Sequence, residues 1–322
     1  MLKKLLFKLL RFSGLPFLCR ELIQRDKVTI LLFHDIDSAA AKKSFLYLQK
    51  KYSIIALDTY LDAVKNGTPL PPKALIITFD DGHIKNYDLL PTIKTLKIPV
   101  TIFLCAAIIN TNRHFWFKHK DLSIPRFQLK RKRNKEKLKL LAEEGFQQNK
   151  EFEKPQAMNK EQILAMAPYV NMQAHALYHP IFPNCTDQEV WKEIYDSKQI
   201  LEAEYNFDIN TIAYPNGDYS LRDIEMVKKA GYQCAVTVDY GFNTIASDPY
   251  RLKRLDVNDT NDLNELIVKA SGLWGFFKTR NGTKQASGLK KTHKKLSMAS
   301  VYTHIAFEGA ELVNDIFISQ GI

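Results

Sequence analysis

The sequence predicts an α/β fold built from parallel strands. Apolar, partly β-branched runs of strand length recur at residues 28–33, 74–79 and 100–104. Helical patterns separate these runs, and strand–helix–strand spacing is typical of parallel βαβ units. Two of the runs end abruptly on polar side chains, His34 and the pair Asp80-Asp81. With 322 residues, the chain has room for one α/β barrel or two ordinary domains.

Residues 1–12 mix Leu and Phe with Lys and Arg at helical spacing and contain no apolar run near 20 residues. This predicts a helix that either lies in a membrane interface or packs on the protein's own core. Lysines interrupt the apolar stretch and no small-residue cleavage site follows, so we do not expect a cleavable signal peptide. We expect a cytoplasmic protein, with peripheral attachment to a membrane as an open alternative.

The remaining elements follow in order. Helices are predicted at 38–52, 59–65 (capped by Asp58), 87–96, 187–205 (capped by Thr186), 221–230 (capped by Ser220) and 263–270. Strands are predicted at 52–57, 169–174, 209–214, 234–238 and 252–257, in addition to the three runs above.

Residues 111–158 break this alternation as a highly charged, helical insertion. Its aromatic residues interleaved with basic ones could bind nucleic acid, but a solvated excursion or lid is the preferred interpretation. The net charge of +11 is concentrated in three segments: 1–27, 118–139 and 278–295 hold seven, ten and seven Lys/Arg against two, two and no acidic residues. The rest of the chain is acidic, which suggests docking to an anionic surface through the edges of the molecule.

The four cysteines are widely separated and include no C-x-x-C pair: Cys19, Cys105, Cys185 and Cys234. Neither a zinc ribbon nor a disulfide framework is therefore indicated. We expect buried free thiols in a reducing compartment.

Three polar residues have the composition of a catalytic metal site. His175 and His179 are four residues apart, which places them on one helical face or around a tight loop. With the carboxylate of Asp81 they offer three ligands and leave positions open for water. Asp80 and Asp81 would point to opposite faces of a strand unless the backbone turns, and Gly82 permits such a turn. A strand end followed by an ordinary Asp-Gly turn remains the alternative.

Three motifs resemble those of the polysaccharide deacetylases, the NodB-homology or carbohydrate esterase family 4 enzymes. They are Thr78-Phe79-Asp80-Asp81-Gly82, His175-x-x-x-His179 and Pro215-x-Gly217, and the resemblance spans about residues 28–257 without the insertion. It implies a deformed (β/α)7 barrel, similar to a TIM barrel. It also implies that Asp80 is the general base and that Asp81, His175 and His179 bind a divalent metal, with Zn favoured over Co or Ni. The backbone N–H of Asn216 would stabilise the oxyanion.

The sequence departs from the family pattern in several places. Ala176 stands where Ser or Thr is usual, and Ala213 replaces the arginine that opens the third motif, so Arg251 or Arg254 is expected to orient Asp80. The late Leu-x-His motif of the general acid is not evident, and His304 fits it poorly. Leu32-Phe33-His34 resembles instead an early motif of circularly permuted members such as poly-N-acetylglucosamine deacetylases. We therefore assign His34 as the general acid. His83 and His114 could also reach a cleft, but we expect both at the surface.

The expected organisation is a basic amphipathic segment at 1–27, a deacetylase barrel at 28–270 with the insertion at 111–158, and a basic extension at 271–322. The expected activity is metal-dependent removal of N-acetyl or O-acetyl groups from a polysaccharide or glycolipid sugar. A catalytically silent carbohydrate-binding barrel and a nucleic-acid-binding protein are the alternatives. No nucleic-acid recognition motif is present, so nucleic acid is not an expected partner.

Overall fold

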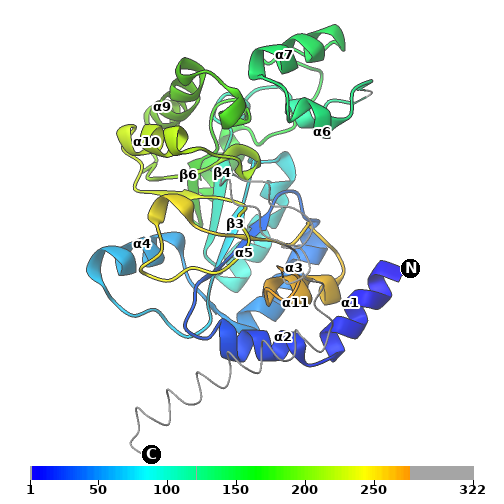
Figure 1. The fold of residues 1–322 in the computed structure, drawn as a ribbon, viewed down its shortest axis with the longest axis vertical. Coiled ribbons are helices and arrows are strands. Elements are labelled where there is room, and N and C mark those ends of the chain that lie inside the picture. Colours follow the sequence, from blue (N-terminus) through cyan, green and yellow to red (C-terminus); the bar gives the residue numbers. More distant parts are fainter. Residues whose placement is uncertain (1, 121, 276–322) are drawn as a thin grey trace, which may run out of the picture.

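A curled sheet of parallel strands forms the centre of the molecule (Figure 1). The structure is a computed structural model that describes residues 2–120 and 122–275. The strands are β1 (Thr29–Phe33), β2 (Ser53–Ile54), β3 (Ala74–Phe79), β4 (Val100–Leu104), β5 (Val170–Ala174), β6 (Thr211–Ala213), β7 (Cys234–Val236) and β8 (Leu255–Asp256). Their order is β7-β6-β5-β4-β3-β1-β8, and β2 pairs with the beginning of β3.

The segment that leads into β8 brings the two edges of this sheet together. Leu252 pairs in parallel with Val236 at the end of β7. Four residues later, Asp256 pairs with Leu32 of β1. The seven strands other than β2 therefore form a nearly closed ring, which confirms the predicted deformed (β/α)7 barrel.

Helices follow most of the strands and cover the outside of the sheet (Figure 1). They are α1 (Leu2–Phe12), α2 (Leu15–Leu18), α3 (Ser38–Lys51), α4 (Leu57–Asn66), α5 (Leu90–Leu96), α6 (Arg126–Leu129), α7 (Asn134–Glu143), α8 (Lys160–Met166), α9 (Asp187–Tyr205), α10 (Leu221–Lys229) and α11 (Leu263–Ala270). The stretch 87–96, predicted as one helix, is a 3₁₀ helix (Ile84–Leu89) followed by α5.

Side-chain caps explain where several helices begin. Thr186 and Ser220 accept hydrogen bonds from the backbone N–H groups of Glu189 and Asp223, as predicted, and both form capping boxes. The prediction that Asp58 caps this helix is wrong. Helix α4 begins earlier, with Ala56 at its N-cap position, because the fully buried Leu57 joins the core as its first residue.

Alternate strand residues divide the core into an inner and an outer layer. Ile30 and Ile76 pack inside the barrel with Phe103, whereas Phe33 and Phe79 face outward beneath the helices. The rings of Phe33 and Phe79 stack at 5.2 Å between centroids. Side chains of a strand alternate between its two faces, so every second residue after Ile76 points inward. Asp80, which follows Phe79, is one of these residues.

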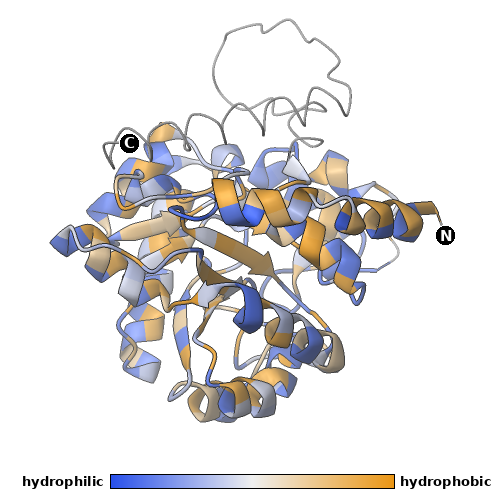
Figure 2. Ribbon diagram, turned by 90° about the horizontal axis from the view of Figure 1, so that it is seen from below, coloured by the Kyte–Doolittle hydropathy of each residue, from blue (hydrophilic) through white to orange (hydrophobic). Residues whose placement is uncertain are grey.

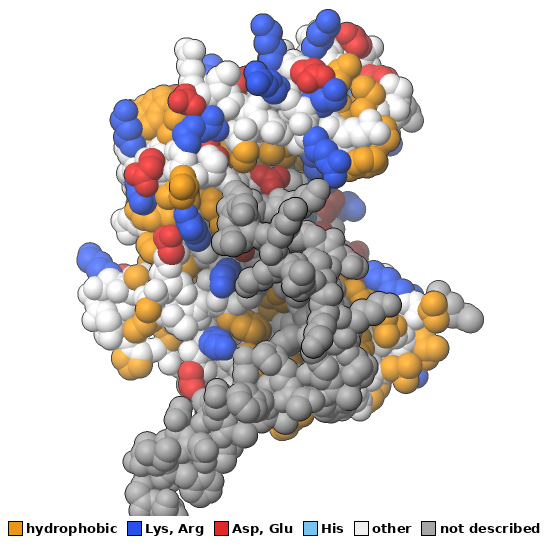
Figure 3. Space-filling view, viewed as in Figure 1, with side chains coloured by type: hydrophobic (Ala, Val, Ile, Leu, Met, Phe, Trp, Pro, Cys, Tyr) orange, Lys and Arg blue, Asp and Glu red, His pale blue; other side chains and the backbone are white. Residues whose placement is uncertain are grey.

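The insertion is helical and charged, as predicted, but it also has a core of its own. Trp116, Leu129, Leu141 and Phe146 form a buried cluster with Ile181 of the barrel. In Figure 3 its basic side chains gather at the top of the molecule, over α6 and α7. The insertion is therefore a packed wall on the barrel and not merely a solvated excursion.

The N-terminal segment lies against the end of the barrel, since α1 packs against α11. Of the predicted basic extension, only residues 271–275 lie within the described part, so His304 falls outside it. All four cysteines are free and buried, as predicted. Among the helices of the described residues, none has the length and apolarity needed to cross a bilayer.

Candidate active site

The carboxyl ends of the strands open into a cleft of about 660 Å³. Parallel α/β folds place their chemistry at this end of the sheet. Barrel residues lining the cleft include Leu32, His34, Asp80, Asp81, His179, Asn216, Gly217 and Asp256, and insertion residues lining it are Phe117, Arg126, Phe127 and Lys130.

Asp80 is buried at the end of β3 and forms a bidentate ion pair with Arg254. Nη1 and Nη2 of Arg254 donate to the two carboxylate oxygens at 2.7 and 2.8 Å. Burial would raise the pKa of Asp80, but the charge of Arg254 outweighs it and, with His175, holds the pKa below its usual value. Two arginines were predicted to orient Asp80, and Arg254 is the one that contacts it. Arg251 pairs with Asp248 instead, with 3.5 Å between Nε and Oδ2.

Asp81 reaches the same cleft because the backbone turns after β3. Its φ is 75° and that of Gly82 is 72°, which is the left-handed region. A Cβ at Gly82 would also lie 2.7 Å from Cδ2 of Leu104, so both conformation and space favour glycine there. The turn brings two adjacent carboxylates to one site, which a regular strand could not do.

His175 and His179 belong to a tight loop after β5, with Ala176 and His179 in the left-handed region. Nδ1 of His175 lies 2.8 Å from the carbonyl oxygen of Ala213. This contact requires a proton on Nδ1 and leaves Nε2 as an acceptor that faces Oδ1 of Asp81 at 3.5 Å. Nε2 of His179 lies 3.6 Å from the same oxygen.

These three residues fit a divalent cation. One ligand atom from each lies within 4.8 Å of the others, and all three residues are buried. Two atoms that bind one tetrahedral zinc ion at about 2.0–2.1 Å are about 3.4 Å apart, close to the separations of 3.5 and 3.6 Å. Oδ1 of Asp81 is buried without a hydrogen-bond partner among the described residues. Burial lowers the pKa of His179 to about 3, so its imidazole is neutral, as a metal ligand must be.

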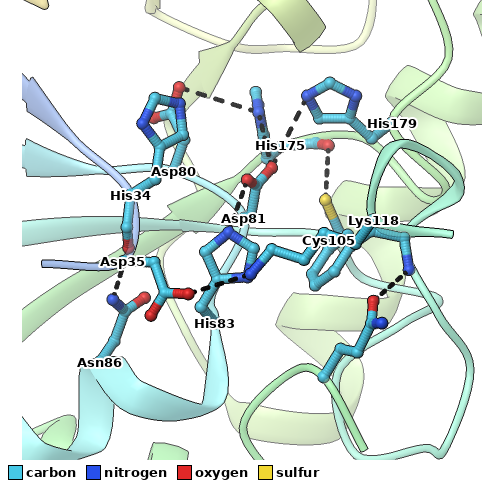
Figure 4. Close-up of polar contacts among 12 residues, drawn as sticks. His34, Asp35, Asp80, Asp81, His83, Asn86, Cys105, Lys118, His175 and His179 are labelled. Atoms are coloured by element: carbon cyan, nitrogen blue, oxygen red, sulfur yellow. Dashed lines mark hydrogen bonds and ion pairs between the residues drawn. The ribbon is translucent and has the colours of Figure 1, made fainter. Parts of the chain in front are cut away.

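A relay of side chains fixes the other oxygen of Asp81 (Figure 4). Nε2 of His83 lies 3.0 Å from Oδ2 of Asp81. Nζ of Lys118 lies 3.1 Å from Nδ1 of His83 and also donates to Asp35 at 3.0 Å. Since an ammonium group only donates, Nδ1 of His83 accepts and Nε2 carries the proton toward Asp81. Burial would raise the pKa of Asp81, but the hydrogen bond from His83 holds it well below its usual range.

The expectation that His83 lies at the surface is therefore wrong, since it is 2% exposed. Its position two residues after Asp81, directly beyond the turn, was the signal that could have revealed it. His114 is half-buried and does not line the cleft; its Nε2 lies 2.8 Å from the carbonyl oxygen of Lys154.

His34 and Asn216 both line the cleft. The His34 side chain is 39% exposed, and its Nδ1 lies 3.7 Å from Oδ2 of Asp259. Asn216 has a φ of 59° and accepts a hydrogen bond from Nζ of Lys130 at 2.5 Å. The structure thus brings together every residue predicted for the site.

Two further residues hold the histidine loop and were missed in the sequence. Oε2 of Glu193, on α9, accepts from the backbone N–H groups of Leu177 and Tyr178 at 2.8 and 2.9 Å. Nε1 of Trp116, in the insertion, donates to the carbonyl oxygen of His179 at 2.8 Å. Neither residue belongs to a motif, and only the folded chain brings them to the loop.

Comparisons with known proteins point to one family. The profile of the polysaccharide deacetylase family matches residues 67–235. A Bacillus subtilis (strain 168) protein whose name refers to a polysaccharide deacetylase, YxkH, is 24% identical over an alignment of 243 residues, and the match covers 72% of each chain.

Solved structures share the fold at low sequence identity. The Streptococcus pyogenes deacetylase PplD, in complex with acetate, aligns with a TM-score of 0.55 at 17% identity, over 75% of this chain and 99% of that one. IcaB from Ammonifex degensii aligns with a TM-score of 0.57 at 18% identity, over 77% and 98% of the two chains.

Proposed function

Because this chain belongs to the polysaccharide deacetylase family, we propose that it is a metal-dependent hydrolase that removes acetyl groups from an N-acetylated polysaccharide or glycolipid. The observation that carries the proposal is one buried cluster, in which Asp81, His175 and His179 converge next to Asp80 at the base of an open cleft. A purely structural barrel has no need to hold two adjacent ionised carboxylates in a buried place, where each must be compensated by charge.

The side chains divide the chemistry among them. A divalent cation held by Asp81, His175 and His179, for which Zn²⁺ is our first choice, would supply Lewis acidity that polarises an amide carbonyl and acidifies water. Asp80, kept ionised by Arg254, accepts the proton of the attacking water.

Two further cleft residues, His34 and Asn216, act on the leaving amine and on the carbonyl oxygen. His34 donates a proton to the nitrogen of the leaving amine, which otherwise departs as a poor leaving group. The backbone N–H of Asn216 stabilises the negative charge that develops on the carbonyl oxygen. Both residues line the cleft that holds Asp80 and Asp81.

Replacing the ligands and the base one at a time tests this division. We expect Asp81→Ala, His175→Ala and His179→Ala each to lose metal and activity. Asp80→Asn should retain metal and lose at least about 10²-fold in kcat. Metal content is measured by elemental analysis of the purified protein, and activity as acetate released from N-acetylglucosamine oligomers and from an acetylated ester substrate.

The outcomes separate the possibilities clearly. Metal loss in Asp80→Asn together with normal metal in Asp81→Ala would reverse the two roles. Stoichiometric metal without acetate release from any substrate of a wide panel would favour the catalytically silent barrel.

A further inference from the structure

Helix α1 exposes an unusual amount of apolar surface. Six of the fifteen large exposed hydrophobic side chains in the described residues belong to α1 and α2: Leu2, Leu5, Leu6, Leu9, Phe12 and Phe17. Leu2 and Phe12, at the two ends of α1, are 82% and 70% exposed. At 3.6 residues per turn, the five on α1 fall within a sector of about 120°. They therefore form one continuous apolar face, and Figure 2 shows hydrophobic residues along the length of α1.

The protein's own core does not use this face. α1 packs on α11 through Phe7 and Leu10, which are buried together with Leu15 and Val268. Phe7 also contacts the ring of Trp274 at 4.8 Å between centroids. The anchoring contacts therefore use Phe7 and Leu10, whereas Leu2, Leu5, Leu6, Leu9 and Phe12 remain exposed. In Figure 3 hydrophobic side chains gather over α1, at the right-hand edge of the molecule.

The charge of α1 is of one sign. The helix carries Lys3, Lys4, Lys8 and Arg11 and no acidic residue. Two of these side chains are engaged by α11, since Lys3 lies 3.1 Å from Glu265 and Arg11 donates to Asn264. Lys4 and Lys8 are exposed. At 100° per residue they lie beyond the Phe12 edge of the apolar face, Lys8 by about 40° and Lys4 by about 80°. An apolar face flanked by lysines complements a surface that is apolar in depth and anionic at its boundary.

We propose that the face formed by Leu2, Leu5, Leu6, Leu9 and Phe12 docks the protein onto an anionic lipid surface, with α1 lying in the plane of the interface. An 11-residue helix is about 16 Å long, well short of the roughly 30 Å hydrocarbon core of a bilayer. It therefore lies along the interface, where its leucines reach the acyl chains and Lys4 and Lys8 remain among the headgroups. This docking is independent of the catalytic residues.

Co-sedimentation of the full chain with lipid vesicles tests the proposal. We expect binding to vesicles of phosphatidylcholine and phosphatidylglycerol, and weaker binding to phosphatidylcholine alone. Leu5→Gln with Leu9→Gln should lower the partition coefficient at least about 100-fold, because each buried methylene favours binding by about fourfold. Glutamine has nearly the helix propensity of leucine, and both side chains are more than half exposed, so the fold should persist.

A matched control replaces two exposed leucines elsewhere. Leu164→Gln with Leu221→Gln changes side chains that are 45% and 72% exposed on α8 and α10, and vesicle binding should remain that of the unmodified protein. Lys4→Gln with Lys8→Gln should lower binding about tenfold or more on anionic vesicles only, since each lysine near such a surface contributes about fivefold.

Each contrary outcome is decisive. The proposal is wrong if the Leu5/Leu9 variant still binds vesicles. It is also wrong if the control variant loses binding to the same extent. Absence of binding by the unmodified protein does so as well. If the Leu5/Leu9 variant instead changes the molecular mass measured by light scattering, the face is an interface between two copies of the chain and the lipid assignment is wrong.

Discussion

The site has two halves that differ in origin. One half comes from the strand ends: Asp80 and Asp81 follow β3, His175 follows β5, and His34 follows β1. The other half comes from the insertion, where Trp116, Lys118 and Lys130 contact His179, His83 and Asn216 respectively. In the proposed mechanism the first half supplies the reacting groups, and the second fixes their orientation.

The difference shows how chemistry and support are distributed in such a barrel. A strand end fixes a side chain through the hydrogen bonds of the sheet, so a short motif is enough to define it. A supporting contact from a loop depends on how two distant segments pack, and no local pattern specifies it. If this division is right, changes in the strand-end half should abolish catalysis, whereas changes in the insertion should weaken it through metal binding.

The largest effect is expected from the strand-end half. His34→Gln should lower kcat on an N-acetylated sugar by about 10²–10⁴-fold and leave metal content intact. The backbone of His34 is held independently of its ring, because its N–H donates to Asp259 and its carbonyl accepts from Asn86. The fold should therefore persist, and steady-state acetate release with elemental analysis provides the measurement.

An aryl acetate ester serves as the internal control for this variant. Its phenolate leaves without a proton, so loss of a general acid should affect it much less than the amide. Equal losses on both substrates would indicate that His34 is not the acid.

A smaller effect is expected from the insertion half. Lys118→Met removes the donor that fixes the proton of His83 on Nε2, beside Asp81. Loss of such an outer partner typically costs about 10–100-fold in metal affinity. Competition with a metal chelator measures the affinity, and saturating metal should restore most of kcat.

Lys120→Met is the matched control, since Lys120 lies two residues away and is exposed. Metal affinity should be unchanged in that variant. A kcat that stays low in Lys118→Met at saturating metal would place Lys118 among the reacting groups and would remove the distinction between the two halves.

The smallest effect on catalysis is expected at Glu193, where a change acts on stability through the support of the histidine loop. Burial raises the pKa of Glu193 from its usual value of 4.5 to about 7, although the N–H groups of Leu177 and Tyr178 and the charges of Lys137 and Lys192 oppose it. The folded state therefore binds this proton more tightly than the unfolded state. The stabilisation from this proton is complete below about pH 4.5 and is lost as the pH rises to about 7. The free energy of unfolding falls by about 3 kcal/mol at most over this range.

Glu193→Gln should remove that dependence, because its amide oxygen can still accept from both N–H groups. Urea unfolding across this pH range gives the free energy of unfolding. Parallel curves for the two proteins would show that Glu193 does not titrate in this window.

Local pattern predicted the barrel and the residues that converge in the cleft, because each depends on a few adjacent residues. Asp80-Asp81-Gly82 carries its own turn, and the helix from Asp187 to Tyr205 carries its own cap. His83 was misplaced because its burial comes from Lys118 and Phe115, contributed by the insertion. Arg254 remained one of two candidates because the closure of the ring, and not its sequence neighbours, decides which arginine faces inward.

The pairing of Asp80 with Arg254 has a consequence for how the protein becomes competent during synthesis. The two residues are 174 positions apart in the chain, and Arg254 lies in the segment that joins the last strand edge to the first. Contacts of such high sequence separation form late, since the entropy of closing a long loop must be overcome first. A nascent chain that has not yet released this segment has an open ring and an Asp80 without its partner. If Asp80 is the base, as proposed above, we expect catalytic competence to arrive only with the last strand and incomplete chains to be inactive.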